Sequence, residues 1–338
     1  MNGGPMAKRM WIAGSALFLV ALACAGASAQ VPAAQREVVA ATNYFRFHSD
    51  ALYNLHDLLT WRTSGLPSAP TDSCTTASPA DWRAFVQAQQ LYANQRGPQR
   101  NRFILALRFE VAGYPGLRLQ PDSVVAPALA ALNAALPAYR ACWWEAHDRR
   151  NRAWIAQLLP RLRPHEDSIG ARLARLYQND WEKPFPVDVV TFASSTGAST
   201  IVEPHHINIS AEDSSYRGDA GVEMVFHEAS HTIIGSARDV IRRIVSDSAA
   251  IGTAQPPRDL AHALLFYTTG RVTQQRLAET GTRDYELYMY KEGVLERAWP
   301  ELRVPMEQHW QAYLDGKTSL AEALRAIVAA VPRRVPDR

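Results

Sequence analysis

Hydrophobic and polar positions follow a helical rhythm along most of the chain. Apolar residues recur three or four positions apart, the spacing of one face of a helix. This spacing predicts helices at residues 36–61, 80–96, 101–112, 122–135 and 137–159, with another after Ser168 and several more from about 236 to 332.

The pattern changes in the middle of the chain, where β-branched and aromatic residues cluster. Short runs of this kind, typical of strands, occupy residues 187–192, 200–202 and 206–209. A second helix, carrying Val222, Val225 and Phe226, follows them. The order of helix, strands, helix and further helices predicts a predominantly helical α+β fold with a small antiparallel or mixed sheet and a helical N-terminal extension.

The first residues are typical of an export signal. Lys8 and Arg9 precede an apolar run of about thirteen residues, and the small residues Ala27-Ser28-Ala29 follow it. A membrane-spanning helix needs about 20 apolar residues, so we interpret residues 1–29 as a signal peptide that is cleaved after Ala29. Lipidation at Cys24, which would make the protein a lipoprotein, is the minor alternative. We expect an exported periplasmic or secreted protein, and no later stretch approaches a membrane span.

The cysteines are interpreted in the light of export. Cys24 is lost with the signal, which leaves Cys74 and Cys142 in an oxidising compartment. Pairing of the two is favoured over two free thiols, and the disulfide would close a loop of about 69 residues. Two cysteines this far apart do not form a cysteine-rich structural zinc site.

Composition excludes several classes of protein. Of the 338 residues, 47% are hydrophobic and 20% charged, which is too apolar for a disordered chain. The formal net charge of +3, from 36 Lys+Arg and 33 Asp+Glu, is too small to indicate nucleic-acid binding.

The candidate chemistry lies in His227-Glu228-Ala229-Ser230-His231, an HExxH motif inside the second helix. Residues four apart lie one turn apart on a helix, so both imidazoles reach a single Zn²⁺. Glu228 is rotated about 100° round the axis and flanks the metal, where it can take a proton from zinc-bound water. No other charge occurs from Met224 to Ile234, as a helix buried beneath an active site requires.

At this motif the chain resembles the zincin metallopeptidases, over about residues 168–240. The resemblance implies that His227 and His231 bind one zinc ion and that Glu228 is the general base and acid. It also implies an antiparallel edge strand that binds extended peptide, and His206–Ser210 is the matching segment. The match is to the superfamily, and no subfamily is identified.

The third zinc ligand is harder to assign because no subfamily signature follows the motif. His262 lies in the apolar run Leu260–Tyr267, and a buried imidazole there needs a partner such as zinc or a backbone carbonyl. We favour His262 as the ligand and keep Glu286 in reserve. Asp247 or Asp259 is a candidate to orient a ligating imidazole.

Other residues are weaker candidates. Tyr285, Tyr288 and Tyr290 are possible oxyanion donors, although tyrosine is also a common core residue. His205 and His206 are adjacent on a predicted strand, so their side chains face opposite ways. His48 and His56, with Asp50 and Asp57 nearby, are explained by a solvated helix face.

These observations predict three segments: a signal peptide at 1–29, a helical region at 30–165 and a zincin-like metallopeptidase domain at 166–338. We expect an exported zinc peptidase that acts on peptides or proteins. The alternatives are a non-catalytic periplasmic binding or assembly factor with a zincin fold, and a di-iron protein in which Glu228-x-x-His231 supplies ligands. The di-iron site needs a second Glu-x-x-His, and Glu145-x-His147 and Glu307-x-His309 are both mis-spaced.

Overall fold

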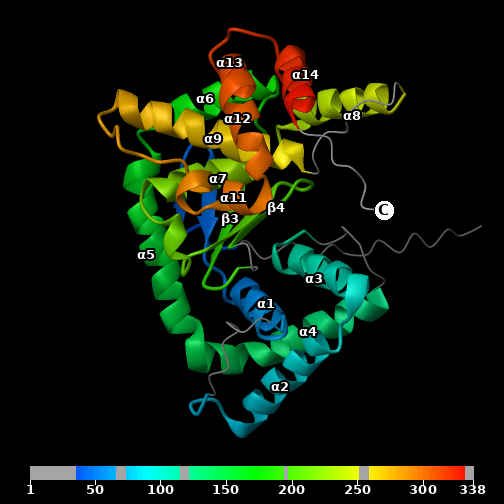
Figure 1. Cartoon of the computed structure of the whole chain (residues 1–338). Coiled ribbons are helices and arrows are strands. Elements are labelled where there is room, and N and C mark those ends of the chain that lie inside the picture. Colours follow the sequence, from blue (N-terminus) through cyan, green and yellow to red (C-terminus); the bar gives the residue numbers. More distant parts are fainter. Residues whose placement is uncertain (1–35, 66–73, 115–121, 194–196, 251–258, 332–338) are drawn as a thin grey trace, which may run out of the picture. The chain divides into compact units, whose positions relative to one another are not determined.

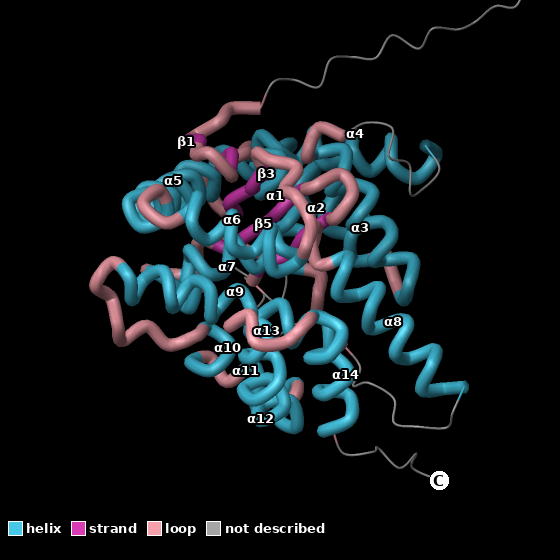
Figure 2. The backbone as a smooth tube through the Cα atoms, turned by 90° about the horizontal axis from the view of Figure 1, so that it is seen from above, coloured by secondary structure: helices cyan, strands magenta, loops and turns pink. Residues whose placement is uncertain are grey.

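The fold was analysed in a computed structural model that describes residues 36–65, 74–114, 122–193, 197–250 and 259–331. The expected signal peptide, Cys24 and the cleavage point after Ala29 lie outside the described residues. Within the described part, the fold is α+β and mostly helical, as predicted, with one small mixed sheet. Figure 2 shows the strands in the interior, surrounded by helices.

The regular elements are as follows. The strands are β1 (Ala40–Ala41), β2 (Phe45–His48), β3 (Phe185–Val190), β4 (Ala198–Ile201) and β5 (His206–Ser210). The helices before β3 are α1 (Ala51–Arg62), α2 (Pro79–Ala93), α3 (Gly97–Val111), α4 (Asp122–Tyr139), η1 (Arg140–Trp144), α5 (Glu145–Leu162) and α6 (Glu166–Tyr177). After β5 come η2 (Ser214–Tyr216), α7 (Asp219–Ser230), α8 (Gly235–Ala250), α9 (Leu260–Glu279), α10 (Tyr288–Lys291), α11 (Val294–Ala298), η3 (Pro300–Leu302), α12 (Arg303–Pro305), η4 (Met306–Trp310), α13 (Gln311–Leu314) and α14 (Leu320–Ala330).

The sheet has the strand order β1-β2-β3-β5-β4. Strand β3 is parallel to both β2 and β5, whereas β1 and β4 are antiparallel to their neighbours. The prediction that His206–Ser210 is an edge strand is therefore wrong. Strand β4 is the edge, because it folds back along the outer side of β5.

The predicted helix at 36–61 is only half right. Residues before Asp50 form β1 and β2, and the helix α1 begins at Ala51. In β2, Phe45 and Phe47 are fully buried and Arg46 between them is exposed, which is the period of a strand. Asp50 caps α1 by accepting a hydrogen bond from the Tyr53 N–H at 2.8 Å.

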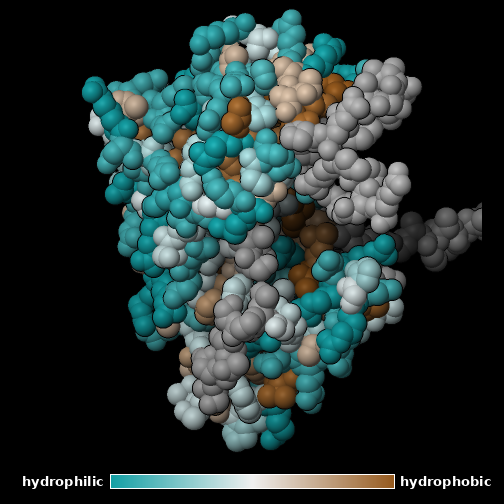
Figure 3. Space-filling model, viewed as in Figure 1, coloured by the Kyte–Doolittle hydropathy of each residue, from teal (hydrophilic) through white to brown (hydrophobic). Residues whose placement is uncertain are grey.

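The sheet separates two groups of helices (Figure 1). Its apolar face, which includes Phe185, Val187 and Val189, contributes to a core that also contains side chains of α5, α6, α7 and α9. The opposite face lies against α1, where Asn54 donates to the Val189 carbonyl at 3.3 Å. A second core cluster joins α1, α2, α3 and α4. The space-filling view in Figure 3 shows a largely hydrophilic surface with scattered hydrophobic side chains.

The polar face of the sheet carries a buried charge network, so the prediction of a solvated helix face at His56 and Asp57 is wrong. Both residues are buried. Arg108 of α3 contacts Asp57 at 3.2 Å, and burial raises the pKa of Asp57 to about 6 despite this cation. Burial acts in the same direction on Asp188, but Arg36 and His206 outweigh it and lower its pKa to about 2.

The described part of residues 36–165 is an integral part of the fold. Strand β2 pairs with β3 in register from Phe45–Phe185, so the two sides of the expected boundary at 165/166 share one sheet. The larger core likewise contains Phe45 and Trp154 from one side of this boundary and Val222 and Phe226 from the other. The boundary does not separate two folding units.

The disulfide prediction is confirmed: Cys74 and Cys142 are bonded, with their Cα atoms 5.7 Å apart. Cys142 lies in η1, where α4 and α5 join into one long helix. By length and composition alone, the stretch Ser123–Leu162 is long and apolar enough to cross a membrane, contrary to the expectation that no later stretch approaches a span.

Candidate metal centre

The helix α7 places the HExxH motif in the interior of the protein. All residues from Ala220 to Ser230 are buried, as expected for a helix beneath an active site. His227 lies in the last turn and His231 is the C-cap residue, with helical backbone angles of −55° and −26°. The two histidines therefore keep their one-turn spacing. They lie at the C-terminal end of α7, where the negative end of the helix dipole favours a nearby cation.

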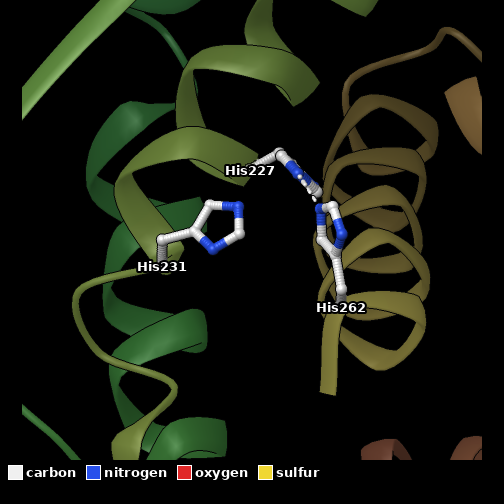
Figure 4. A group of neighbouring side chains, drawn as sticks. All are labelled: His227, His231 and His262. Atoms are coloured by element: carbon white, nitrogen blue, oxygen red, sulfur yellow. Dashed lines mark hydrogen bonds between the residues drawn. The ribbon is translucent and has the colours of Figure 1, made fainter. Parts of the chain in front are cut away.

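His262 completes a cluster of three imidazoles. It lies near the start of α9, and its ring faces those of His227 and His231 (Figure 4). One ligand atom from each ring can be chosen so that all three lie within 4.8 Å of one another. Nε2 of His262 is 3.3 Å from Nε2 of His227.

The spacing of two of these rings fits a tetrahedral metal site. Zinc–nitrogen bonds of about 2.0–2.1 Å place two ligand nitrogens about 3.3–3.4 Å apart. The His227–His262 separation of 3.3 Å has this value. Among the described residues, His227, His231 and His262 form the one group of three or more possible ligand side chains (His, Cys, Asp or Glu) whose ligand atoms lie close enough together to hold an ion.

Burial favours the neutral form of all three rings, which is the form that metal ligation requires. Burial lowers the pKa of His227 well below its usual value, and the neighbouring His231 and His262 add to this. Burial, His262 and Arg238 lower the pKa of His231 to about 3. Burial also lowers the pKa of His262, although Asp259 opposes it.

Glu228 lies beside the cluster and is held by the edge strand. The Thr200 hydroxyl of β4 is 2.6 Å from Glu228 Oε2 and 2.9 Å from the Glu228 carbonyl oxygen. Burial raises the pKa of Glu228 to about 7, although the Thr200 hydrogen bond lowers it. A carboxylate with a pKa near neutrality can both accept and release a proton.

A cavity of about 550 Å³ brings these groups together. It is lined by the three histidines and Glu228, by Ala198, Ser199 and Thr200 of β4, and by Asp213, Tyr216, Met224, Phe266, Tyr288, Val294, Arg297 and Trp299. Its lining therefore combines aromatic and apolar side chains with the histidines, Glu228 and a few other polar groups. This is the usual make-up of a ligand site.

The reserve candidates do not join the cluster. Glu286 is exposed and does not line the cavity. Asp247 is exposed on α8, whereas the Asp259 carbonyl accepts a hydrogen bond from the His262 N–H at 2.8 Å. Asp259 is thus the nearer of the two orienting candidates.

Of the three candidate tyrosines, only Tyr288 lines the cavity. Its hydroxyl is 3.2 Å from the Ser215 hydroxyl. Tyr285 donates to Glu223 at 2.6 Å and Tyr290 donates to Glu307 at 3.0 Å.

Neither adjacent histidine lines the cavity. His206 is buried and contacts Asp188 at 2.8 Å, while His205 stacks on Phe185.

Sequence reasoning missed several residues around the site. Thr200 lies in a predicted strand, but nothing in the sequence indicates its contact with Glu228. Arg238 places a guanidinium nitrogen 3.4 Å from His231 Nδ1. Arg297 and Trp299 reach the cavity from a segment more than 60 residues after the motif.

Comparisons of the chain with family models, with curated proteins and with solved structures gave no match.

Proposed function

We propose that the chain is an exported zinc-dependent peptidase with a zincin-like catalytic arrangement. One observation carries the proposal: three imidazoles converge within 4.8 Å, and Glu228 of the same motif lines the cavity beside them. His227, His231 and His262 would hold the ion. A bound zinc ion supplies a Lewis acid that polarises a carbonyl and acidifies water.

The protein residues would divide the remaining work. Glu228 accepts a proton from the attacking water and delivers it to the departing amine, a double role that suits its pKa of about 7. Thr200 orients that carboxylate from the edge strand. Of the three tyrosines considered from the sequence, Tyr288 is the one placed to donate a hydrogen bond to the developing oxyanion, because it lines the cavity and Tyr285 and Tyr290 do not.

The sheet edge supports a peptide substrate. Strand β4 pairs only with β5 within the described sheet, and three of its residues line the cavity. An extended peptide lying along the free side of β4 would pass next to Glu228. This strand, rather than the segment His206–Ser210, would take the substrate-binding role that the zincin resemblance implies.

Metal analysis and two substitutions test the proposal. The purified mature chain is expected to contain about one zinc per molecule, as a single three-histidine site implies. Glu228→Gln should keep the metal and lose cleavage of a mixed peptide library, because the variant has no base. His262→Ala should lose the metal, because two imidazoles bind zinc too weakly.

His309→Ala is the matched control, since His309 lies outside the cluster and the cavity. It should keep both metal and activity. Cleavage by Glu228→Gln at the wild-type rate would refute the assigned mechanism. A wild-type chain that binds zinc and cleaves nothing in the library would favour the non-catalytic alternative.

A further inference from the structure

Arg297 introduces a positive charge into the wall of the cavity. It is the only lysine or arginine among the residues that line the cavity in the described part of the chain. The acidic lining residues are Glu228, next to the histidines, and Asp213. Asp213 already accepts hydrogen bonds from the Ser215 N–H at 2.9 Å and hydroxyl at 2.6 Å.

The local backbone holds the guanidinium group of Arg297 in place. Nη1 donates to the Glu292 carbonyl at 2.6 Å. The same nitrogen lies 3.2 Å from the position that a Cβ atom at Gly293 would occupy. Gly293 has a positive φ of 61° as well, so both the backbone conformation and the space for the guanidinium favour glycine there.

Arg297 is exposed, and its charge contributes, after Arg303, to lowering the pKa of the neighbouring Glu296. Glu296 contacts Arg303 instead, and among the described residues no ion pair joins Arg297 to an acidic side chain. A guanidinium has five N–H groups, and the bond to Glu292 uses one of them. The others remain available to a ligand that enters the cavity.

A carboxylate is the ligand that this group fits best. Arginine presents its N–H groups as a planar fork that binds both oxygens of a carboxylate at once. The apolar and aromatic side chains Val294, Phe266 and Trp299 line the same cavity and would contact the rest of the ligand. Trp299 also lies beside His262, with ring centroids 5.6 Å apart, so this wall adjoins the metal centre.

Building on the proposed function, we infer that Arg297 is a specificity-determining residue that selects peptides with a carboxylate near the scissile bond. Two sources of this carboxylate share the same chemistry: the C-terminus of a short peptide and an acidic side chain. The amidated and acidic arms of the experiment separate them.

The experiment compares three pools of N-dansylated tripeptides, randomised over all residues except Asp and Glu at each position apart from the acidic pool's fixed residue. One pool has a free C-terminus, one is amidated, and one is amidated but carries a fixed glutamate. Binding to the full mature chain is measured by fluorescence polarisation with Glu228→Gln as the background, so that no turnover is needed. Cleavage by the otherwise wild-type chain is measured in parallel.

Binding of at least one carboxylate pool should be about tenfold or more tighter than binding of the amidated pool without glutamate, as expected for a charge-assisted pair of hydrogen bonds. Arg297→Gln should abolish this difference and leave the weaker binding unchanged. Arg297→Lys should keep part of it, because the charge remains and the fork is lost. The control Arg102→Gln, at an exposed arginine of α3 outside the cavity, should keep all of it.

Preference for the free C-terminus would identify the terminal carboxylate as the ligand, and preference for the glutamate pool would identify an acidic side chain. Equal binding of all three pools would overturn the inference, as would an equal loss for all pools in Arg297→Gln. Because binding is measured without turnover, a chain that discriminates among the pools but cleaves none would contradict the peptidase proposal and still support the role of Arg297.

Discussion

Glu223 allows a direct test of how burial controls a charge behind the candidate site. This side chain is fully buried on α7, one turn before His227. Its Oε2 atom accepts hydrogen bonds from the Tyr285 hydroxyl at 2.6 Å and the Tyr288 N–H at 3.1 Å. Its Oε1 atom has no hydrogen-bond partner among the described residues. The carboxyl group of Glu223 thus anchors the segment that carries Tyr288 to α7.

Burial raises the pKa of Glu223 from 4.5 to about 7, although its two hydrogen bonds lower it. The folded protein therefore retains this proton at pH values where the unfolded chain has lost it. The contribution of Glu223 to the free energy of unfolding is fully present below about pH 4.5. It is lost as the pH rises to about 7, because unfolding then releases the proton. At about 1.4 kcal/mol per pH unit, the loss amounts to about 3 kcal/mol.

Glu223→Gln removes the titration and keeps the shape of the side chain. The amide adds donors near Oε1 that lack a partner, at a cost that does not change with pH. The free energy of unfolding of the variant, relative to wild type, should therefore rise by about 3 kcal/mol between pH 4.5 and pH 8.5, which corresponds to roughly 6 °C in melting temperature. Every other titrating group cancels in this difference.

The assay is urea unfolding followed by tryptophan fluorescence at several pH values. Glu286→Gln is the matched control, because Glu286 is exposed in the same segment, and its stability should run parallel to that of wild type at every pH. Parallel curves for Glu223→Gln as well would refute the argument, since they would mean that Glu223 ionises in the folded protein as readily as in the unfolded chain.

Two further predictions concern the disulfide and the edge strand. Replacement of both Cys74 and Cys142 by serine should lower the free energy of unfolding by about 4 kcal/mol, because the bond joins two residues 68 positions apart; an unchanged urea midpoint would contradict this. Thr200→Val should slow peptide cleavage about tenfold without loss of zinc, because Glu228 loses the hydrogen bond that orients it, whereas Thr200→Ser should keep the rate. Equal rates for the valine and serine variants in a kcat measurement would rule out this positioning role.

The candidate site was more predictable from the sequence than the sheet around it. The pairing of His227 with His231 follows from the pitch of a helix, which is a local property. His262 was predicted because an imidazole in an apolar helix needs a partner, and the structure brings it to the other two rings. Arg297 and Thr200 could not be found in this way, because their approach depends on how distant segments pack.

The order of the strands in the sheet could not be predicted from the sequence, because it is a property of tertiary packing. The segment His206–Ser210 has the composition of a strand, but nothing local indicates that β4 returns along its outer side. The misassigned start of α1 has a different cause. In the short run Tyr44–Phe47, Tyr44 and Phe47 have helical spacing whereas Phe45 and Phe47 have strand spacing, so the segment fits both patterns.

The parallel pairing of β2 with β3 has a consequence for the order in which the chain is made. Phe45 and its partner Phe185 are 140 residues apart. At about 5–20 residues per second, a ribosome completes this stretch in roughly 7–30 s. During that interval Phe45 and Phe47 of β2, which are fully buried in the folded protein, have no β3 to pair with. A nascent chain that stops before residue 185 therefore leaves β2 open to pairing with other chains.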